Sequence, residues 1–257
     1  MITAGVDCGA KNVKVVVLRD GHVAGKAMVL AGIDAGAAAE AAYEAALKEA
    51  GLARGDVTKV VSTGAGKNEP SFKDDIMTEV GADARGIHEL FPDVRTLVDV
   101  GAEEGRAIRI NAAGKVVDFA INEKCAAGAG AFTEAMARAL EVPLEEFGEM
   151  SLQSTQTIPM NAQCAVFAES EVVSLVHRKT PKPDMVRAIH DAIADRITSM
   201  VRRVGIEERI ALTDGVAKNV GFVASLKEDL QTDLIVASEP DYVGAIGAAF
   251  AAADPTG

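Results

Sequence analysis

The chain has 257 residues, of which 49% are hydrophobic and 25% charged, as is typical of a soluble globular protein. Its formal net charge of −12 and its lack of tryptophan argue against nucleic-acid binding, because phosphate backbones select basic surfaces. No run approaches the ~18 apolar residues of a membrane span, and no signal peptide is visible. With three cysteines outside any disulfide framework, we expect a cytoplasmic α/β protein.

Strands are predicted where apolar, β-branched residues run together between turns. They cover 2–7 and 13–18, begin again at 22, and continue at 57–63, 96–101, 106–110, 116–121 and 210–215, where the last strand runs into a turn. Helices are predicted where apolar residues recur at steps of three and four. They cover 35–50, the segment after each of two cysteines, 183–204, and the apolar run 243–253.

An internal repeat indicates two related subdomains. Gly5-Val-Asp-Cys-Gly9 and Leu97-Val-Asp-Val-Gly101 both place an aspartate and a glycine at the end of a strand, followed by a second strand and a turn. We therefore expect a first subdomain made of residues 1–92 plus 241–257. Residues 93–240 are expected to form the second.

The repeated loops have the chemistry of a nucleotide site. Glycine lets backbone N–H groups approach phosphate oxygens closely, and an aspartate holds Mg²⁺ through its water ligands. Asp7 and Asp99 are the candidate carboxylates. A third glycine turn, at 214–217, follows a late strand and is expected to lie near the adenosine.

Two cysteines share the pattern Asn-x-x-Cys-Ala, at Cys125 and Cys164. Two thiols are too few for a four-ligand metal centre, but two copies of the chain supply four. The alternative is that both are small buried hydrophobes, which is the usual fate of a free cysteine. Cys8 alternates with Asp7 along the first strand, so we expect it to point into the core.

Six segments, in this order, resemble the ATPase family of 2-hydroxyacyl-CoA dehydratase activators and benzoyl-CoA reductase ATP-binding subunits. They are Gly5-Val-Asp-Cys-Gly9, Val98-Asp-Val-Gly101, Cys125-Ala-Ala-Gly-Ala-Gly130, Cys164-Ala-Val-Phe-Ala-Glu-Ser-Glu171, Thr213-Asp-Gly-Val-Ala-Lys-Asn219 and Gly244-Ala-Ile-Gly-Ala-Ala249. The resemblance implies the acetate-and-sugar-kinase/Hsp70/actin-like fold, with two related subdomains around a nucleotide cleft. It also implies a dimer whose subunits share one [4Fe-4S] cluster.

The same resemblance assigns roles to individual residues. It makes Cys125 and Cys164 the cluster ligands and gives Asp7, Asp99 and Glu103 catalytic roles in ATP hydrolysis with Mg²⁺. The residues expected to bind ATP are Gly9, Ala10, Lys11, Lys14, Gly101, Ala102, Asp214, Gly215 and Val216.

Three loops depart from the family pattern. Ala10-Lys11 stands where a serine or threonine is common, and Glu103 replaces the glutamine expected to orient the attacking water. Asp214-Gly215 replaces a Gly-Gly pair. The continuation Gly105-Arg-Ala-Ile-Arg109 resembles benzoyl-CoA reductase subunits more than dehydratase activators.

The resemblance implies an ATP-driven iron-sulfur electron-transfer subunit of benzoyl-CoA reductase or, as the alternative, an activator of a 2-hydroxyacyl-CoA dehydratase. The expected partners are a second ATPase subunit, identical or paralogous, the CoA-ester reductase or dehydratase component, and a low-potential donor such as ferredoxin or flavodoxin. A small-molecule kinase and an iron-free ATP-dependent binding module are alternatives on the same fold. Neither of these needs the repeated cysteine pattern.

Overall fold

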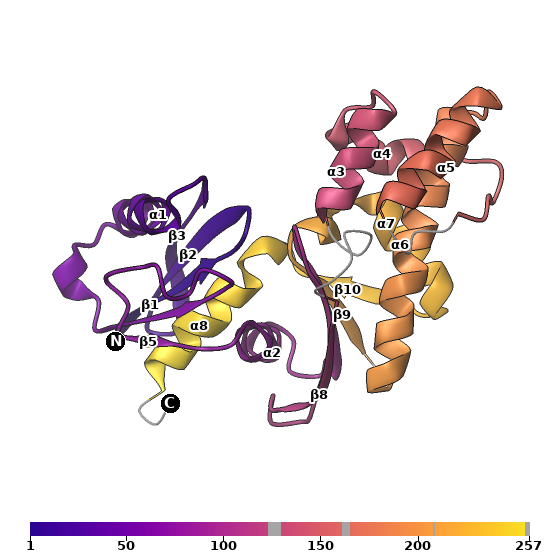
Figure 1. The fold of residues 1–257 in the computed structure, drawn as a ribbon. Helices are drawn as coiled ribbons and strands as arrows, with labels where there is room; N and C mark the ends of the chain where they lie inside the picture. The colour runs from indigo at the N-terminus through magenta and orange to yellow at the C-terminus, as the bar shows by residue number, and fades with distance from the viewer. Residues whose placement is uncertain (123–129, 161–164, 208, 255–257) are drawn as a thin grey trace. The chain divides into compact units, whose positions relative to one another are not determined.

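A computed structural model describes residues 1–122, 130–160, 165–207 and 209–254, and the chain forms two compact units (Figure 1). The first unit comprises Met1–Val94, Ile110–Val117 and Ala237–Gly257, and the second comprises Arg95–Arg109 and Asp118–Val236. The sequence predicts boundaries after residues 92 and 240. The units of the structure divide at Val94 and Ala237, and residues 110–117 belong to the first.

The first unit is built on a five-stranded sheet with the order β3-β2-β1-β4-β5. Strand β1 runs antiparallel to β2 and parallel to β4. The elements in chain order are β1 (Ile2–Cys8), β2 (Asn12–Arg19), β3 (His22–Leu30), α1 (Ala35–Ala50), η1 (Arg54–Asp56), β4 (Lys59–Thr63), β5 (Asp75–Ile76), α2 (Glu79–Leu90), η4 (Pro240–Tyr242) and α8 (Val243–Ala253).

The second unit repeats this design with the order β10-β9-β6-β7-β8. Strand β6 runs antiparallel to β7 and parallel to β9, as β1 does with β2 and β4. Its elements are β6 (Thr96–Val100), β7 (Gly105–Ile110), β8 (Val116–Asn122), α3 (Gly130–Ala139), α4 (Leu144–Ser151), α5 (Ala165–His177), α6 (Lys182–Val204), β9 (Ile210–Thr213), η3 (Gly215–Lys218), α7 (Val220–Leu230) and β10 (Leu234–Val236). The predicted pair of related α/β subdomains is confirmed.

Local sequence explains where the main helices begin and end. The Asp34 carboxylate accepts a hydrogen bond from the N–H of Ala37 at the start of α1, and Gly51 ends the helix with φ 64°. Along α6, the apolar side chains that recur at three- and four-residue steps, such as Ile189, Ile193 and Ile197, are buried in the core of the second unit. Burying each side chain of this size contributes roughly 1.5–3 kcal/mol. Among the described helices, none combines the length and hydrophobicity needed to cross a bilayer.

Helix α8 packs closely on the first sheet and beside α2 (Figure 1). Glycine makes this approach possible, because an ideal Cβ on Gly5 of β1 would lie 2.0 Å from the carbonyl oxygen of Ala245. A Cβ on Gly247 of α8 would lie 1.8 Å from the carbonyl oxygen of Ala82. The apolar run at 243–253 is therefore the buried core helix that its composition predicts.

We predict that Gly247→Ala lowers the free energy of unfolding by about 3 kcal/mol, because the new methyl group forces α8 away from α2. Gly55→Ala is the matched control, since a Cβ there would meet nothing within 4 Å, and it should change stability by less than about 0.5 kcal/mol. Urea denaturation of the two variants measures both values. Equal stability would show that α8 does not depend on this contact.

Candidate functional site

The candidate phosphate loop of the first unit follows a partly buried ion pair. Asp7 lies opposite Lys14 in the β1–β2 register, and Lys14 Nζ donates to Asp7 Oδ2 at 3.0 Å. The side chain of Asp7 stays 15% exposed. Next in the chain, the N–H of Gly9 donates to the carbonyl of Asn12, and Ala10 and Lys11 are exposed in the turn. The structure thus brings the predicted residues of this loop together.

A second loop of the first unit lies against the first one. The N–H of Gly66 donates to the carbonyl of Cys8 at 2.9 Å. Gly64 has φ 92°, and a Cβ there would lie 2.5 Å from the Cys8 oxygen, so only glycine fits. These glycines are not among the residues predicted from the sequence. Their position after strand β4, beside β1 in the sheet, was the available signal.

The second unit repeats the ion pair, with arginine in place of lysine. Asp99 lies opposite Arg106 in the β6–β7 register, and Arg106 Nη1 donates to Asp99 Oδ1 at 2.7 Å. Arg106 Nη2 donates to Glu104 Oε2 at 2.6 Å, and Thr213 Oγ1 donates to Asp99 Oδ2 at 3.1 Å. Both oxygens of Asp99 are engaged, and its side chain is only 5% exposed.

The second and third loops meet within the second unit. The N–H of Gly101 donates to the carbonyl of Glu104, and Ala102 and Glu103 form the turn between them, with Glu103 exposed. The Asp214 carboxylate reaches this turn, because a Cβ on Gly101 would lie 2.6 Å from Asp214 Oδ2. These predicted residues therefore occupy one site with Asp99.

Asp214 has a backbone conformation that favours glycine, with φ 63° and ψ −171°. Its Oδ1 accepts a hydrogen bond from the N–H of Gly215 at 2.8 Å, which opens η3. Gly215 is exposed, and Val216 is buried against the core of the unit.

The start of helix α3 is hydrogen bonded to the second loop. The N–H of Gly130 donates to the carbonyl of Gly101 at 2.7 Å, and that of Ala131 donates to Ala102 at 2.8 Å. A Cβ on Gly130 would also lie 3.2 Å from a methyl carbon of Val216. The residues that directly follow the Cys125 segment in sequence are thus held by both loops of this unit.

The two predicted cluster ligands, Cys125 and Cys164, lie outside the described residues. Cys8 is described and is fully buried, and burial, with smaller contributions from Asp7 and Glu69, raises the pKa of its thiol to about 11. A thiol that stays protonated is a poor metal ligand. In the part of the chain that the structure describes, no group of three or more His, Cys, Asp or Glu side chains is arranged to bind a metal.

A buried histidine supports the helix that follows the third loop. Asn219 Oδ1 accepts from the N–H groups of Gly221 and Phe222 at the start of α7. Asn219 Nδ2 in turn donates to Nε2 of His190 on α6 at 3.0 Å. Burial, and to a smaller degree the charge of Arg187, lowers the pKa of His190 to about 3. The ring is therefore neutral and able to accept.

Comparison with known proteins decides the family. Residues 4–252 match the BadF/BadG/BcrA/BcrD ATPase family. The chain belongs to this family. The predicted relationship is confirmed, and the two-sheet architecture matches the predicted actin-like fold. A ROK family glucokinase from Streptomyces griseus shares this fold at 12% identity, with a TM-score of 0.62 over 98% of this chain and 99% of the other.

Dehydratase activators are prominent among the relatives. The activator of lactoyl-CoA dehydratase from Anaerotignum propionicum is 38% identical over 97% of this chain and 96% of its own length. The activator of the 2-hydroxyisocaproyl-CoA dehydratase from Clostridium difficile, solved with bound ADPNP, is 34% identical with a TM-score of 0.92, covering 98% of this chain and 94% of that chain. A benzoyl-CoA reductase subunit from Thauera aromatica is 35% identical over 97% of this chain and 92% of its length.

We predict that Asp214→Gly is more stable than Asp214→Ala by about 1–3 kcal/mol. Both variants lose the hydrogen bond to Gly215, but only glycine relieves the positive φ. Chemical denaturation of the two purified variants measures the difference. Identical midpoints would mean that the loop relaxes to an ordinary φ without cost.

We predict that His190 makes the fold sensitive to acid. Its pKa is about 3 in the folded chain and 6.5 in the unfolded chain, so between these values the unfolded state binds more protons. Stability is then fully present above pH 6.5 and falls, by up to about 1.4 kcal/mol per pH unit, as the pH drops toward 3.

The test is the free energy of unfolding of His190→Gln and wild type, measured between pH 7 and pH 4. The difference in free energy of unfolding between wild type and His190→Gln should become smaller as the pH falls, because the variant lacks the titrating group. Parallel curves for His190→Gln and wild type would contradict this assignment.

Proposed function

We propose that this chain is the ATP-driven activator of a 2-hydroxyacyl-CoA dehydratase, to which it delivers low-potential electrons. The relatives favour this function over the benzoyl-CoA reductase subunit that the sequence motifs place first, because several of them are dehydratase activators. The observation that carries the proposal is the pair of hydrogen bonds from the start of α3 to the second loop. They connect the proposed ATP-binding loop to the helix that follows the Cys125 segment in sequence.

The two aspartates have different proposed roles in nucleotide binding. Asp7 holds the Mg²⁺ water shell, since Lys14 binds only one of its oxygens and its side chain is partly exposed. Exposed Lys11 supplies the charge for a phosphate oxygen in place of a hydroxyl contact. Both oxygens of Asp99 are already engaged, so its proposed role is to position Arg106 and the second loop.

Glu103 is the proposed residue for the attacking water. It is exposed at the tip of the second loop, where a carboxylate is able to accept a proton from water as the γ-phosphate is transferred. Gly101 and Ala102, beside it, provide the backbone of this turn. Asp214, Gly215 and Val216 are proposed to contact the nucleoside.

Hydrolysis at the second loop is proposed to alter the cysteine segment through α3. The carbonyls of Gly101 and Ala102 accept from the first two N–H groups of the helix, so a shift of the loop moves the helix start. Cys125 lies five residues before Gly130 in the sequence. A movement of the helix start is therefore proposed to reach the cluster ligand through only five residues of chain.

The proposed cluster requires two chains. Cys125 and Cys164 provide two thiolates per chain, and a [4Fe-4S] cluster takes four. When bound, the cluster supplies one-electron transfer at low potential. Cys8 is excluded from this set by its burial and its raised pKa.

Ala131→Pro tests the coupling. Proline removes the N–H that donates to Ala102 but is tolerated in the first turn of a helix. We expect the variant to hydrolyse ATP and to hold iron, while the visible circular dichroism of the cluster no longer changes on addition of MgATP. Ala131→Ser keeps the N–H and is the control. A normal spectral response in Ala131→Pro would contradict the proposed route.

Iron analysis tests the ligand set. Anaerobically reconstituted wild type should contain about two Fe per chain, which is half of a four-iron cluster. Cys125→Ser and Cys164→Ser should each lose the iron and weaken the dimer, because a hydroxyl is a poor substitute for thiolate. Cys8→Ser should retain it. Iron loss confined to Cys8→Ser would refute the assignment.

A further inference from the structure

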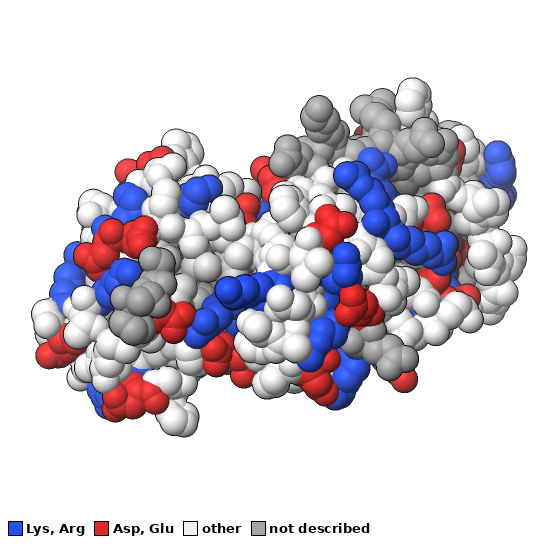
Figure 2. Space-filling model, turned by 90° about the horizontal axis from the view of Figure 1, so that it is seen from below, with Lys and Arg blue, Asp and Glu red and all other residues white. Residues whose placement is uncertain are grey.

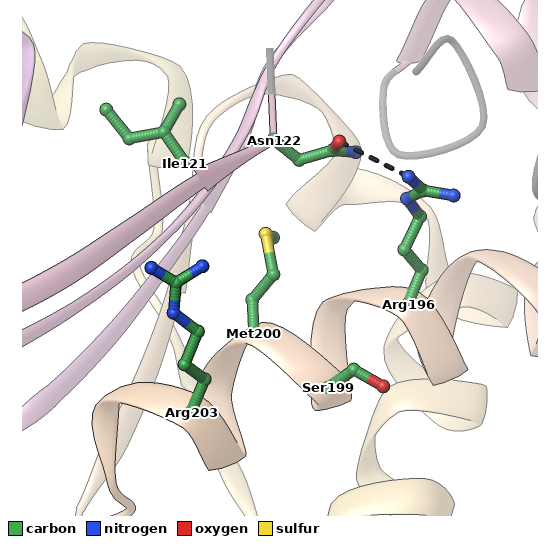
Figure 3. Close-up of a pocket in the computed structure, with 6 residues that line it drawn as sticks. All are labelled: Ile121, Asn122, Arg196, Ser199, Met200 and Arg203. Carbon is green, nitrogen blue, oxygen red and sulfur yellow. Dashed lines mark hydrogen bonds between the residues drawn. The ribbon is translucent and has the colours of Figure 1, made fainter. Parts of the chain in front are cut away.

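A hollow of about 280 Å³ lies in the second unit between the end of β8 and the last turns of α6 (Figure 3). We call it the arginine pocket. It is lined by Ile121, Asn122, Arg196, Ser199, Met200 and Arg203. The α6 residues recur at steps of three and four, so they share one face of the helix. Figure 3 shows both arginine side chains reaching from α6 toward β8, on either side of Met200.

Within the described residues, the two arginines have no acidic partner. Arg196 makes a single hydrogen bond, from Nη2 to Oδ1 of neutral Asn122 at 3.5 Å. Arg203 makes no hydrogen bond or ion pair in the same part of the chain. Elsewhere in this unit, Arg106 and Arg187 are each bound to two carboxylates. In a chain with a net charge of −12, this places two arginines without a described carboxylate partner at one pocket.

The charges of the lining residues strengthen this contrast. Figure 2 shows red and blue side chains interspersed over much of the face seen from below. Among the described residues, the lining of the pocket offers hydrogen-bond donors and no carboxylate. The group that would bind in this pocket is therefore anionic and rich in hydrogen-bond acceptors.

The dimensions favour side chains of a protein over an enclosed small molecule. Seven residues separate Arg196 from Arg203, which is a rise of about 10 Å along a helix. The hollow is smaller than the roughly 300–1,000 Å³ of typical ligand pockets. Two carboxylates on a protein surface match the spaced guanidinium groups, and an apolar group between them matches Met200 and Ile121.

The location indicates which partner. Asn122 precedes Cys125 by three residues, a chain length that spans at most about 11 Å. The pocket is built entirely within the second unit and includes none of the nucleotide loops. An electron donor must come close to the cluster and needs no contact with the nucleotide, so a site outside these loops suits a donor.

We propose that the arginine pocket is the docking site for a small acidic electron-donor protein. This inference rests on the proposed electron-transfer function. Two acidic proteins repel each other over most of their surfaces, so a local positive pocket selects the docking position and raises the association rate. Electron-transfer encounters of this type use small interfaces.

The test uses reconstituted full-length protein and a reduced bacterial ferredoxin in a stopped-flow experiment. Arg196→Gln/Arg203→Gln should lower the second-order rate constant for cluster reduction about tenfold at low ionic strength, and the deficit should shrink as salt is added. Lys48→Gln/Arg178→Gln removes the same charge from two exposed positions and should change the rate less than about twofold. Titanium(III) citrate, which needs no docking site, should reduce all three proteins at the same rate.

Unchanged ferredoxin kinetics in Arg196→Gln/Arg203→Gln would overturn the proposal. Equal slowing by ferredoxin and titanium(III) citrate would also overturn it, because the defect would then lie in the cluster. Wild-type protein that binds no iron would refute the proposed function itself. This last result is distinguished from the others by iron analysis before mixing.

Discussion

The structure of each unit depends on one ion pair at the end of its first hairpin, partly buried in the first unit and buried in the second. Asp7 pairs with Lys14, and Asp99 pairs with Arg106, at equivalent positions of the two sheets. Removing one partner of the buried Asp99–Arg106 pair leaves an uncompensated buried charge, at a cost of about 3–5 kcal/mol. In both units the glycine loop follows directly after the aspartate of the pair. These loops are the ones proposed to bind the nucleotide.

From the difference between the two pairs we infer different roles for the two units. Lys14 is a single point charge that leaves one oxygen of Asp7 open to a ligand. The planar guanidinium of Arg106 binds both Asp99 and Glu104, and these two contacts hold the second loop in place. The same loop accepts the hydrogen bonds from Gly130 and Ala131. We infer that the first unit holds the metal and that the second relays the nucleotide state to the cysteines.

Prediction from sequence succeeds where the signal is local. Helix α1 follows from its alanine-rich periodicity and Gly51, and the Asp-x-Gly repeat predicts two matching sheets. Partners that lie far apart along the chain are missed. Thr213 reaches Asp99 across more than a hundred residues, and no periodicity encodes that contact. The conformation of Asp214 is likewise a property of the folded loop, where an aspartate occupies a backbone region that glycine prefers.

The central claim is that ATP hydrolysis by this chain drives an electron to a dehydratase. The most direct measurement mixes the reduced, cluster-loaded protein with a purified 2-hydroxyacyl-CoA dehydratase and follows dehydratase activity and phosphate release together. We predict activation that requires MgATP, is absent with ADPNP, and is lost in Asp7→Asn. Activation that proceeds equally without nucleotide, or steady ATP hydrolysis with no activation of any dehydratase tested, would contradict the claim.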